Sequence, residues 1–555
     1  GRLFREFSIV ISGSVIISSF AALTFTPMLA TKLLIKREKQ SWFYAKTEPF
    51  FEGMNRLYSR SLAAFLRKRW IALPFTVITI CLIGFLWNIV PAEMAPLEDR
   101  SQISINTRGA EGVTYEYIRD YTEDINQLVD SILPDAEAVT ARVSSGSGNV
   151  RITLKDMQDR NYTQMEVAEK ISKAVQKKTM ARSFVQQQSS FGGRRGSMPV
   201  QYVLQATNLE KLEEVLPKFM AKVYENPVFQ MADVDLKFSK PEARIQINRD
   251  KASIMGVSTK NIAQTLQYGL SGQRMGYFYM NGKQYEILGE INRQQRNKPA
   301  DLKAIYIRSN NGDMIQLDNL IELEDGIAPP KLYRYNRFVS ATISAGLADG
   351  KTIGQGLDEM DKIAKETLDD TFRTALSGDS KEYRESSSSL MFAFILAILL
   401  IYLILAAQFE SFKDPLVIML TVPLAIAGAL VFMYFSGITM NIFSQIGIIM
   451  LIGLVAKNGI LIVEFANQKQ ETGEDKMTAI KDAALQRLRP ILMTSASTVL
   501  GLIPLAFATG EGCNQRIAMG TAVVGGMVVS TLLTMYIVPA IYSYISTNRI
   551  KKLEE

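Results

Sequence analysis

Histidine is absent from this 555-residue chain, and cysteine occurs only at Cys81 and Cys513. The chain therefore lacks the side chain that most often serves as a general base near neutral pH. Two distant cysteines support neither a disulfide framework nor a cysteine metal site. The sequence also contains no nucleotide-binding glycine loop and no nucleophile motif. An enzyme is the least expected class, and no cofactor is expected.

Charged residues are nearly absent from seven apolar runs, each long enough to cross about 30 Å of hydrocarbon. These runs predict a polytopic α-helical membrane protein with a large soluble insert between the second and third runs. They lie near residues 8–31, 70–91, 389–408, 415–436, 442–465, 490–509 and 518–543. We assign transmembrane helices to residues 1–34 and 70–91, and five more to residues 381–545.

The formal net charge is +7, but the basic residues lie mainly beside the apolar runs, which is typical of membrane orientation rather than of nucleic-acid binding. Lys32 to Arg69 holds ten Lys or Arg against three acids. If successive spans cross the membrane in alternating directions, one side holds three basic segments: Lys32 to Arg69, residues 469–489 and the tail 546–555. The positive-inside rule predicts that this side is cytoplasmic. The insert then faces the periplasm of a Gram-negative cell.

Residues 35–69 alternate aromatic and aliphatic residues with basic ones at helical spacing. This pattern predicts an amphipathic helix on the cytoplasmic membrane surface, with a soluble connector as the alternative. The chain starts at Gly1 without the charged, apolar and cleavable segments of a signal peptide, in that order. We expect the start to be a cut inside a longer protein.

The insert opens with a predicted module at residues 92–197 in the order βαββαβ, a ferredoxin-like arrangement of α+β class. Its helices are expected near 114–132 and 163–178, and its middle strands are joined by the flexible turn "SGSGN". The Gly- and Ser-rich stretch "SSFGGRRGSM" marks a boundary at about 189–198. The same pattern repeats over residues 198–239 and 331–380, interrupted by a separate αβ segment at 240–330.

Lys457 lies inside the apolar run "LIGLVAKNGILIVEFANQ". Placing an ammonium group in hydrocarbon costs about 3 kcal/mol even on lenient scales. Three interpretations remain open: a lysine that reaches the headgroups, a structural buried pair, or a proton or ion relay.

A relay needs a counter-charge, and the other six runs hold no Asp or Glu in their central parts. Glu464 lies seven residues nearer the cytoplasm on the same run. Asn458, Thr494 and Ser495 could donate or accept hydrogen bonds near the lysine, although hydroxyl groups on helices also bond to their own backbone.

Arg487 and Arg489 are expected at the cytoplasmic mouth of the run that begins near residue 490. Pro490 would suit its first turn, where a missing N–H group costs nothing. The small residues of "GTAVVGGMVVSTLL" in the last run predict close helix packing.

Three stretches match a known family: "GLVAKNGILIVEFAN", "RLRPILMTSAS" and "REFSIVISGSVIISSFAALTFTPMLATKLL". Together they resemble the resistance-nodulation-division (RND) transporters, specifically the hydrophobe and amphiphile efflux group of Gram-negative inner membranes. The resemblance extends over essentially the whole chain in consistent order.

The resemblance implies a pump of twelve spans in two repeated halves, of which this chain is similar to the sixth span and the second half. It implies that Lys457 pairs with two aspartates on a fourth span that this chain does not contain. It also implies a relay role for Thr494 and a position on the cytoplasmic proton route for Arg487. With Asn458 beside the lysine, these residues form our candidate proton relay, and the proton-motive force would be the energy source.

For the insert, the resemblance implies two porter subdomains that line a cleft, with residues 240–330 as a docking subdomain. It also implies a homotrimer that works with a periplasmic adaptor and an outer-membrane channel. The first module departs from multidrug members, because its middle strands carry Thr140, Arg142 and Arg151 instead of phenylalanines, and the loop between them is short. These three residues are candidate substrate contacts, or the edge is merely solvated.

Two other functions remain as alternatives. A heavy-metal-ion exporter of the same architecture would use soft methionine ligands, and five methionines fall in or beside the first module. They are Met94, Met157, Met165, Met180 and Met198. Three sulfurs that converge in the cleft would favour this alternative. A protein-export or assembly scaffold with the same fold is the other.

Overall fold

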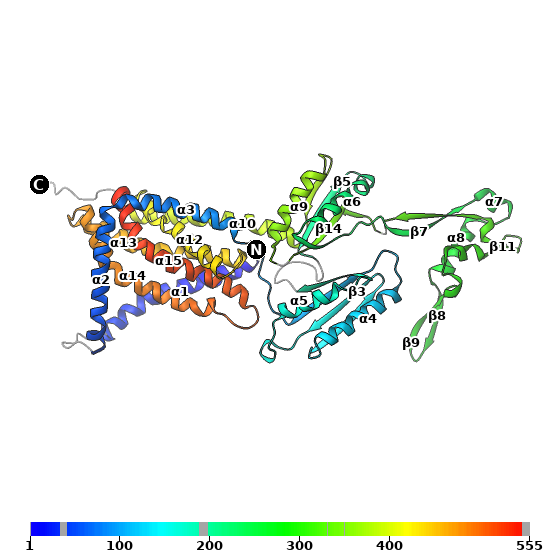
Figure 1. The fold of residues 1–555 in the computed structure, drawn as a ribbon, viewed down its shortest axis with the longest axis horizontal. Coiled ribbons are helices and arrows are strands. Elements are labelled where there is room, and N and C mark those ends of the chain that lie inside the picture. The colour runs from blue at the N-terminus through cyan, green and yellow to red at the C-terminus, as the bar shows by residue number, and fades with distance from the viewer. Residues whose placement is uncertain (1, 34–41, 188–197, 330, 349, 547–555) are drawn as a thin grey trace.

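The computed structural model describes residues 2–33, 42–187, 198–329, 331–348 and 350–546, and it contains a helical bundle and a sheet-rich region joined end to end (Figure 1). Among these residues, seven spans are long and apolar enough to cross a membrane, in agreement with the seven predicted runs. The helices that form them are α1 (Arg2–Leu33), α3 (Ala72–Ile89), α10 (Gly378–Phe409), α11 (Asp414–Met419) with α12 (Thr421–Phe435), α13 (Ile442–Glu471), α14 (Lys476–Ala506) and α15 (Cys513–Ile545).

Proline positions explain two features of the bundle. The fourth span breaks between α11 and α12, because Pro423 has no N–H group to donate to the carbonyl of Met419. Helix α14 begins at Lys476, where the Asp475 side chain accepts a hydrogen bond from the Met477 N–H group. Pro490 therefore lies inside this helix, and the prediction that it occupies a first turn was wrong. The stretch before it is rich in Ala, Leu, Lys and Arg, which extend the helix.

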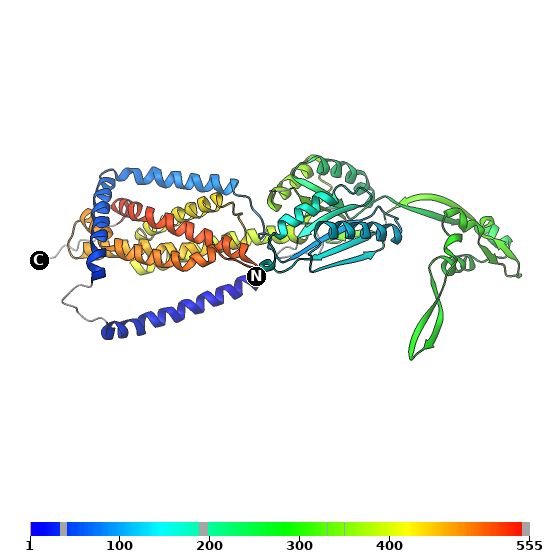
Figure 2. The same ribbon diagram turned by 60° about the horizontal axis from the view of Figure 1, so that its bottom comes forward.

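Helix α2 (Trp42–Arg67) lies across the end of the bundle that is remote from the sheets, which we call the far end (Figure 2). Its Tyr58 and Leu62 are buried against the bundle, and the Tyr58 hydroxyl donates to the Met535 carbonyl at 2.6 Å. Residues 35–41 of the predicted surface helix lie outside the described residues. Helix α1 lies apart from the other helices, and its apolar stretch is not buried.

Helix α15 forms the centre of the bundle, where it packs against α12, α13 and α14. A Cβ atom added to Gly526 would lie 2.1 Å from Leu451 Cδ2 and 2.8 Å from the Ala425 carbonyl oxygen. Glycine is therefore required for this approach, in agreement with the close packing predicted for this run.

The first α+β unit is a four-stranded antiparallel sheet in the order β2-β3-β1-β4, with two helices on one face (Figure 1). Strand β2 ends at Ser144 and β3 begins at Ser147, so the predicted "SGSGN" turn is shorter than expected. Gly146 adopts a positive φ of 78° in this tight turn. The elements are β1 (Gln102–Arg108), α4 (Tyr115–Ile132), β2 (Ala138–Ser144), β3 (Ser147–Thr153), α5 (Gln164–Val175) and β4 (Arg182–Gln187).

The second α+β unit is built from two separate parts of the chain. Strand β14 pairs with β5, β6 and β13, and β15 pairs with the other edge of β5. Helices α6 and α9 cover the sheet, and their apolar faces form its core. The elements are β5 (Val200–Ala206), α6 (Leu209–Glu225), β6 (Phe229–Val234), β13 (Tyr333–Tyr335), β14 (Phe338–Leu347), α9 (Ile353–Thr367) and β15 (Arg373–Leu376).

The inserted unit projects from the second α+β unit, away from the bundle (Figure 1). Its ends come together because β7 pairs antiparallel with β12, from Lys240 opposite Ala328 to Ile247 opposite Ile321. The elements are β7 (Lys240–Ile247), α7 (Arg249–Ile254), α8 (Thr259–Leu270), β8 (Gln273–Met280), β9 (Lys283–Gly289), β10 (Tyr306–Arg308), β11 (Met314–Gln316) and β12 (Ile321–Ala328). The boundary predicted at 189–198 lies almost wholly outside the described residues.

Candidate functional site

Lys457 lies in α13 and is partly buried between α13 and α14. Its ammonium group donates a hydrogen bond to the Thr498 hydroxyl at 3.1 Å. The Thr498 hydroxyl in turn donates to the Thr494 carbonyl at 2.8 Å, one helical turn back. Within the described part of the chain, Lys457 forms no ion pair. The ammonium group is therefore held by neutral oxygen.

Asn458 faces a different part of the bundle, because consecutive residues on a helix are about 100° apart. It is fully buried, and its amide donates to the Ser495 hydroxyl and to the Thr531 hydroxyl, both at 3.3 Å. The Thr531 hydroxyl also donates to Ser495 at 3.1 Å. The structure thus ties Asn458 to α14 and α15 rather than to Lys457.

Thr494 is exposed, and its hydroxyl donates to the Ile491 carbonyl at 3.2 Å on its own helix. Thr498, which contacts the lysine, was missed in the sequence. One signal could have found it: Thr498 follows Thr494 by four residues, so both lie on the same face of α14. Thr531 carried no such signal, because it comes from a different helix.

Arg487 lies near the far end of the bundle, with its guanidinium 4.4 Å from the centre of the Phe465 ring. Its Nε atom is buried and has no hydrogen-bond partner among the described residues. Arg487 and Lys457 are not in contact through any described hydrogen bond, so the structure brings together only part of the candidate relay.

A buried polar network at the far end was also missed in the sequence. Asp414, at the start of α11, is fully buried and accepts hydrogen bonds from Asn467 at 3.2 Å and from Ser546 at 2.8 Å. Gln470 donates to the Tyr542 hydroxyl at 2.7 Å, and Tyr542 donates to Asn467. The network joins the ends of α11, α13 and α15, and it satisfies polar groups that would be costly to bury alone.

The candidate substrate contacts lie on an open face of the first α+β unit. Thr140 on β2 is directly opposite Arg151 on β3, and Arg142 is opposite Asn149. All three side chains are exposed. The structure therefore brings Thr140 and Arg151 together, but none of the three lines the cavity between the two α+β units.

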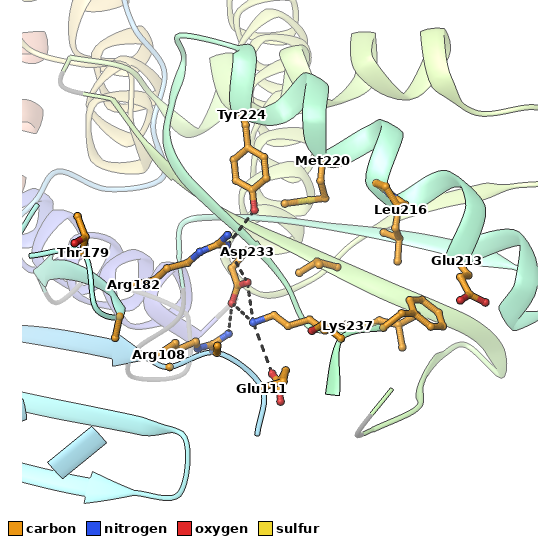
Figure 3. Close-up of a pocket in the computed structure, with 18 of the residues that line it drawn as sticks. Arg108, Glu111, Thr179, Arg182, Glu213, Leu216, Met220, Tyr224, Asp233 and Lys237 are labelled. Atoms are coloured by element: carbon orange, nitrogen blue, oxygen red, sulfur yellow. Dashed lines mark hydrogen bonds and ion pairs between the residues drawn. The ribbon is translucent and has the colours of Figure 1, made fainter. Parts of the chain in front are cut away.

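A cavity of about 690 Å³ lies between the two α+β units (Figure 3). Leu216, Met220 and Leu236 are among its apolar lining residues. Tyr224 of α6 contributes a hydroxyl group that accepts a hydrogen bond from Arg182 at 3.1 Å.

Cations from both units meet at one carboxylate in this cavity (Figure 3). Arg108 of β1 lies 2.7 Å from Asp233, which is almost fully buried at the end of β6. Lys237 lies 3.0 Å from the same carboxylate, and Arg182 of β4 lies 3.9 Å from it. The ion pairs thus connect the first unit to the second beside an apolar wall.

Glu98 connects the first α+β unit to the bundle, and its neighbour Asp99 caps a helix within that unit. Glu98 is 1% exposed, and its carboxylate accepts hydrogen bonds from the backbone N–H groups of Asn514 at 3.3 Å and Gln515 at 2.8 Å. These are first-turn N–H groups of α15, whose N-cap Gly512 offers no side chain. A carboxylate at this position also interacts favourably with the helix dipole.

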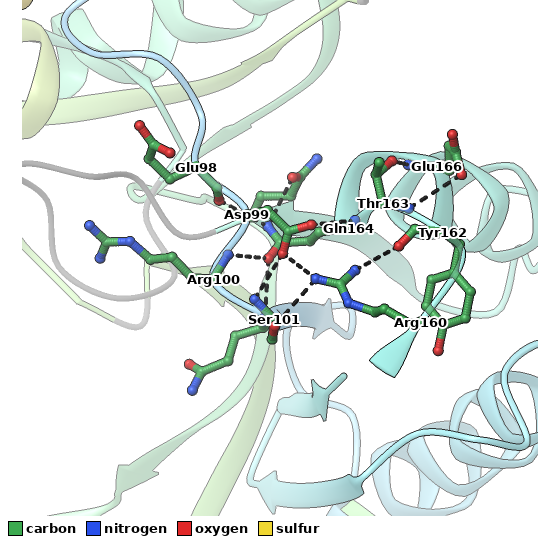
Figure 4. Close-up of polar contacts among 11 residues, drawn as sticks. Glu98, Asp99, Arg100, Ser101, Arg160, Tyr162, Thr163, Gln164 and Glu166 are labelled. Carbon is green, nitrogen blue, oxygen red and sulfur yellow. Dashed lines mark hydrogen bonds and ion pairs between the residues drawn. The ribbon is translucent and has the colours of Figure 1, made fainter. Parts of the chain in front are cut away.

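Asp99 performs the same task for α5 (Figure 4). Its carboxylate accepts hydrogen bonds from the Gln164 N–H group at 2.9 Å, from the Ser101 N–H group at 3.1 Å and from the buried Arg160. Burial raises the pKa of Asp99, but these hydrogen bonds outweigh it and lower the pKa below its ordinary value. Two consecutive carboxylates therefore cap one helix of the bundle and one helix of the first unit.

The described residues contain no group of three or more His, Cys, Asp or Glu side chains placed to hold a metal ion. Met180 and Met220 both line the cavity between the units. Three converging sulfurs would favour the alternative of a heavy-metal-ion exporter, and no third methionine lines this cavity among the described residues.

Comparison with known proteins gives a family match over nearly the whole chain. The model of the AcrB/AcrD/AcrF family matches residues 1–546. An uncharacterized transporter of Haemophilus influenzae is 31% identical over 563 residues, which cover 99% of this chain and 54% of that relative. The chain thus spans about half the length of the curated relative that it matches.

Proposed function

The chain belongs to the AcrB/AcrD/AcrF family of RND transporters, and from this premise we propose that it is the C-terminal portion of a proton-driven efflux pump. The pump would be a secondary active transporter that exports small amphiphilic compounds. Protonation changes near Lys457 would open and close the cavity between the α+β units.

One observation carries this proposal: an ammonium group lies within a membrane span without a carboxylate partner in the described chain. A neutral hydroxyl compensates poorly for the desolvation of a cation, so the group needs an anion or must lose its proton. Anionic partners on the other half of a complete transporter would supply the charge. Intramembrane ionisable residues of this kind mark proton routes.

The proposal extends to the sheet-rich region. The two α+β units would be ferredoxin-like porter subdomains, and the inserted unit would be half of a docking domain. The two α+β units and the inserted unit would face the periplasm, and the bundle would lie in the inner membrane. A homotrimer would work with a periplasmic adaptor and an outer-membrane channel. The repeated strand order of the two units supports this assignment.

The cavity between the units is the candidate substrate site. An apolar wall beside an ion cluster suits a molecule with an apolar body and a polar end. Arg108, Lys237 and Asp233 would bind or release the polar end as the units separate. We prefer this substrate class to a metal ion, because the lining is largely apolar and includes two methionines rather than three.

Replacing Lys457 by Ala in the full-length protein tests the mechanism. We expect proton-coupled export from reconstituted vesicles to fall by about tenfold or more, because the ammonium group can no longer respond to nearby carboxylates. Export should be measured with an imposed proton gradient and with a protonophore.

Lys469→Ala is the matched control, since Lys469 lies on the same helix but pairs with Glu474 at 2.6 Å outside the apolar stretch. Proton-coupled export by the Lys469→Ala protein should equal export by the wild type. Undiminished proton-coupled export by the Lys457→Ala protein would exclude the relay. If the protonophore does not reduce export by the wild type, the protein is a scaffold or uses another energy source.

A further inference from the structure

A second pocket, of about 570 Å³, lies between α2 and α14 at the far end of the bundle. Three arginines line it: Arg56 and Arg60 from α2, and Arg489 from α14. Its neutral polar lining consists of Asn55, Ser59 and Gln486. These side chains offer many N–H and O–H donors in one place.

Positive charge exceeds negative charge in this pocket, because no carboxylate is among its described lining residues. Arg56 pairs with Glu52 on its own helix at 2.9 Å, but both side chains are exposed, so the pair is weak. Arg489 lies 3.4 Å from Glu48. Arg60 forms no ion pair with any residue that the structure describes. An anion could therefore bind without displacing a strong internal pair.

The geometry of Arg489 favours a phosphate over a simple anion. Its guanidinium carbon lies over the Phe51 ring, 4.4 Å from the ring centre, and this cation–π contact restrains the side chain. One of its N–H groups donates to Glu48, and the remaining N–H groups can donate two parallel hydrogen bonds to two oxygens of one phosphate.

The pocket lies at the far end of the bundle, where lipid headgroups would lie if the bundle crosses a membrane. Helix α2 crosses the end of the bundle, with Tyr58 buried against it and with Phe50 and Leu57 exposed. An amphipathic helix in this position rests at the boundary between headgroups and acyl chains. Leu485 is the apolar member of the lining, and the apolar stretch of α14 begins soon after it.

We propose that this pocket binds the phosphate group of an anionic phospholipid headgroup. Anionic lipids concentrate negative charge at the membrane surface, where clustered arginines attract them. The lipid would connect α2 to α14 and so hold the surface helix on the bundle. This proposal requires that the bundle lie in a membrane, and it does not depend on what the protein transports.

Native mass spectrometry of the full-length protein tests the proposal, with phosphatidylglycerol or phosphatidylcholine added to the detergent micelles. We expect the wild type to retain phosphatidylglycerol in preference to phosphatidylcholine. In the double variant Arg60→Gln, Arg489→Gln, retention of phosphatidylglycerol should fall by about tenfold, because two charge-assisted phosphate contacts are lost.

Arg67→Gln is the control for the α2 half of the double variant: it removes one positive charge from α2 outside the pocket, and its lipid retention should be unchanged. Gln486→Glu keeps all three arginines but adds a carboxylate, and it should reduce retention even if the double variant does not fold. Equal retention of the two lipids, or full retention by both pocket variants, overturns the proposal. If inorganic phosphate alone binds with the same dependence on the arginines and excludes the lipid, the ligand is free phosphate and the lipid assignment fails.

Discussion

Lys457 and Asn458 are neighbours in the chain, yet they lie in different environments. The partly buried lysine bonds to Thr498 of α14, whereas Asn458 is fully buried among hydroxyl groups of α14 and α15. The buried amide fixes how α13 packs, whereas the partly exposed lysine bonds to a neutral hydroxyl. Two neighbouring residues in one helical turn thus have different roles: Asn458 packs the helix, and Lys457 carries the charge.

Asp99 gives a prediction at the level of one carboxylate. Its folded-state pKa is lowered, so its stabilising effect is present above the pKa of the unfolded chain and is lost as pH falls through the folded pKa. We expect Asp99→Asn to lower the free energy of unfolding by about 1.5–3 kcal/mol at pH 7, since hydrogen bonds to a charged group are lost. The difference from the wild type should shrink below about pH 4.

Denaturant unfolding at pH 7, 5 and 3 measures this difference in the free energy of unfolding. These pH values lie on both sides of the ordinary aspartate pKa of about 3.9. Asp130→Asn is the control, because Asp130 is exposed on the same unit, in α4. It should leave the pH dependence unchanged. A wild-type to Asp99→Asn difference that stayed constant across this range would contradict the assigned role of the charge.

At the level of elements, close contact between α15 and its neighbours depends on glycine. Gly526 meets both Leu451 of α13 and the backbone of α12, so no displacement of a single side chain makes room for a methyl group. We expect Gly526→Ala to destabilise the bundle by about 1–3 kcal/mol through overpacking. The midpoint of thermal unfolding in detergent measures the effect.

Gly501→Ala provides the comparison, because a Cβ atom at Gly501 in α14 meets nothing within 4 Å. Alanine is the better helix former by about 0.5–1 kcal/mol, so this variant should be as stable as the wild type or more stable. Equal destabilisation of the two variants would show that overpacking is not the cause.

At the level of the whole molecule, the bundle and the first α+β unit are joined through Glu98. Its carboxylate caps α15, and Asn514 also donates to the Leu97 carbonyl at 2.7 Å. A movement of α15 along its axis would therefore carry the start of the first unit with it. This contact offers a path between the membrane helices and the cavity between the units.

Glu98→Ala should loosen this junction. Loss of a helix cap costs about 0.5–2 kcal/mol, so we expect faster hydrogen exchange at the amides of Asn514 and Gln515, with little change in the sheet of the second unit. Hydrogen-exchange mass spectrometry resolves the two regions.

Glu511→Gln is the control for this measurement. Glu511 lies in the same loop, but Arg516 contacts only its backbone carbonyl in the described structure, at 3.0 Å. Exchange at α15 should match the wild type in this variant. Unchanged exchange in the Glu98→Ala protein would mean that the cap contributes little to the junction.

The family, the membrane spans and the order of elements were all readable in the sequence. Hydrophobic run length and periodicity depend only on residues that are near in the chain, so they survive without any tertiary information. Helix ends were less accessible: α14 starts well before its apolar run, because propensity and the Asp475 cap extend it. Lys457 was evident for the same local reason, as a charge in an apolar run.

By itself the sequence determined which residues would be costly to bury, but only the tertiary structure decided which groups compensate them. Thr498 meets Lys457, Asn467 meets Asp414, and Arg108 meets Asp233 across large separations in the chain. These pairings depend on helix rotation and on how the units dock, which no local pattern encodes. The same physical reason places Arg489 beside α2, where two segments that are far apart in sequence form one cationic pocket.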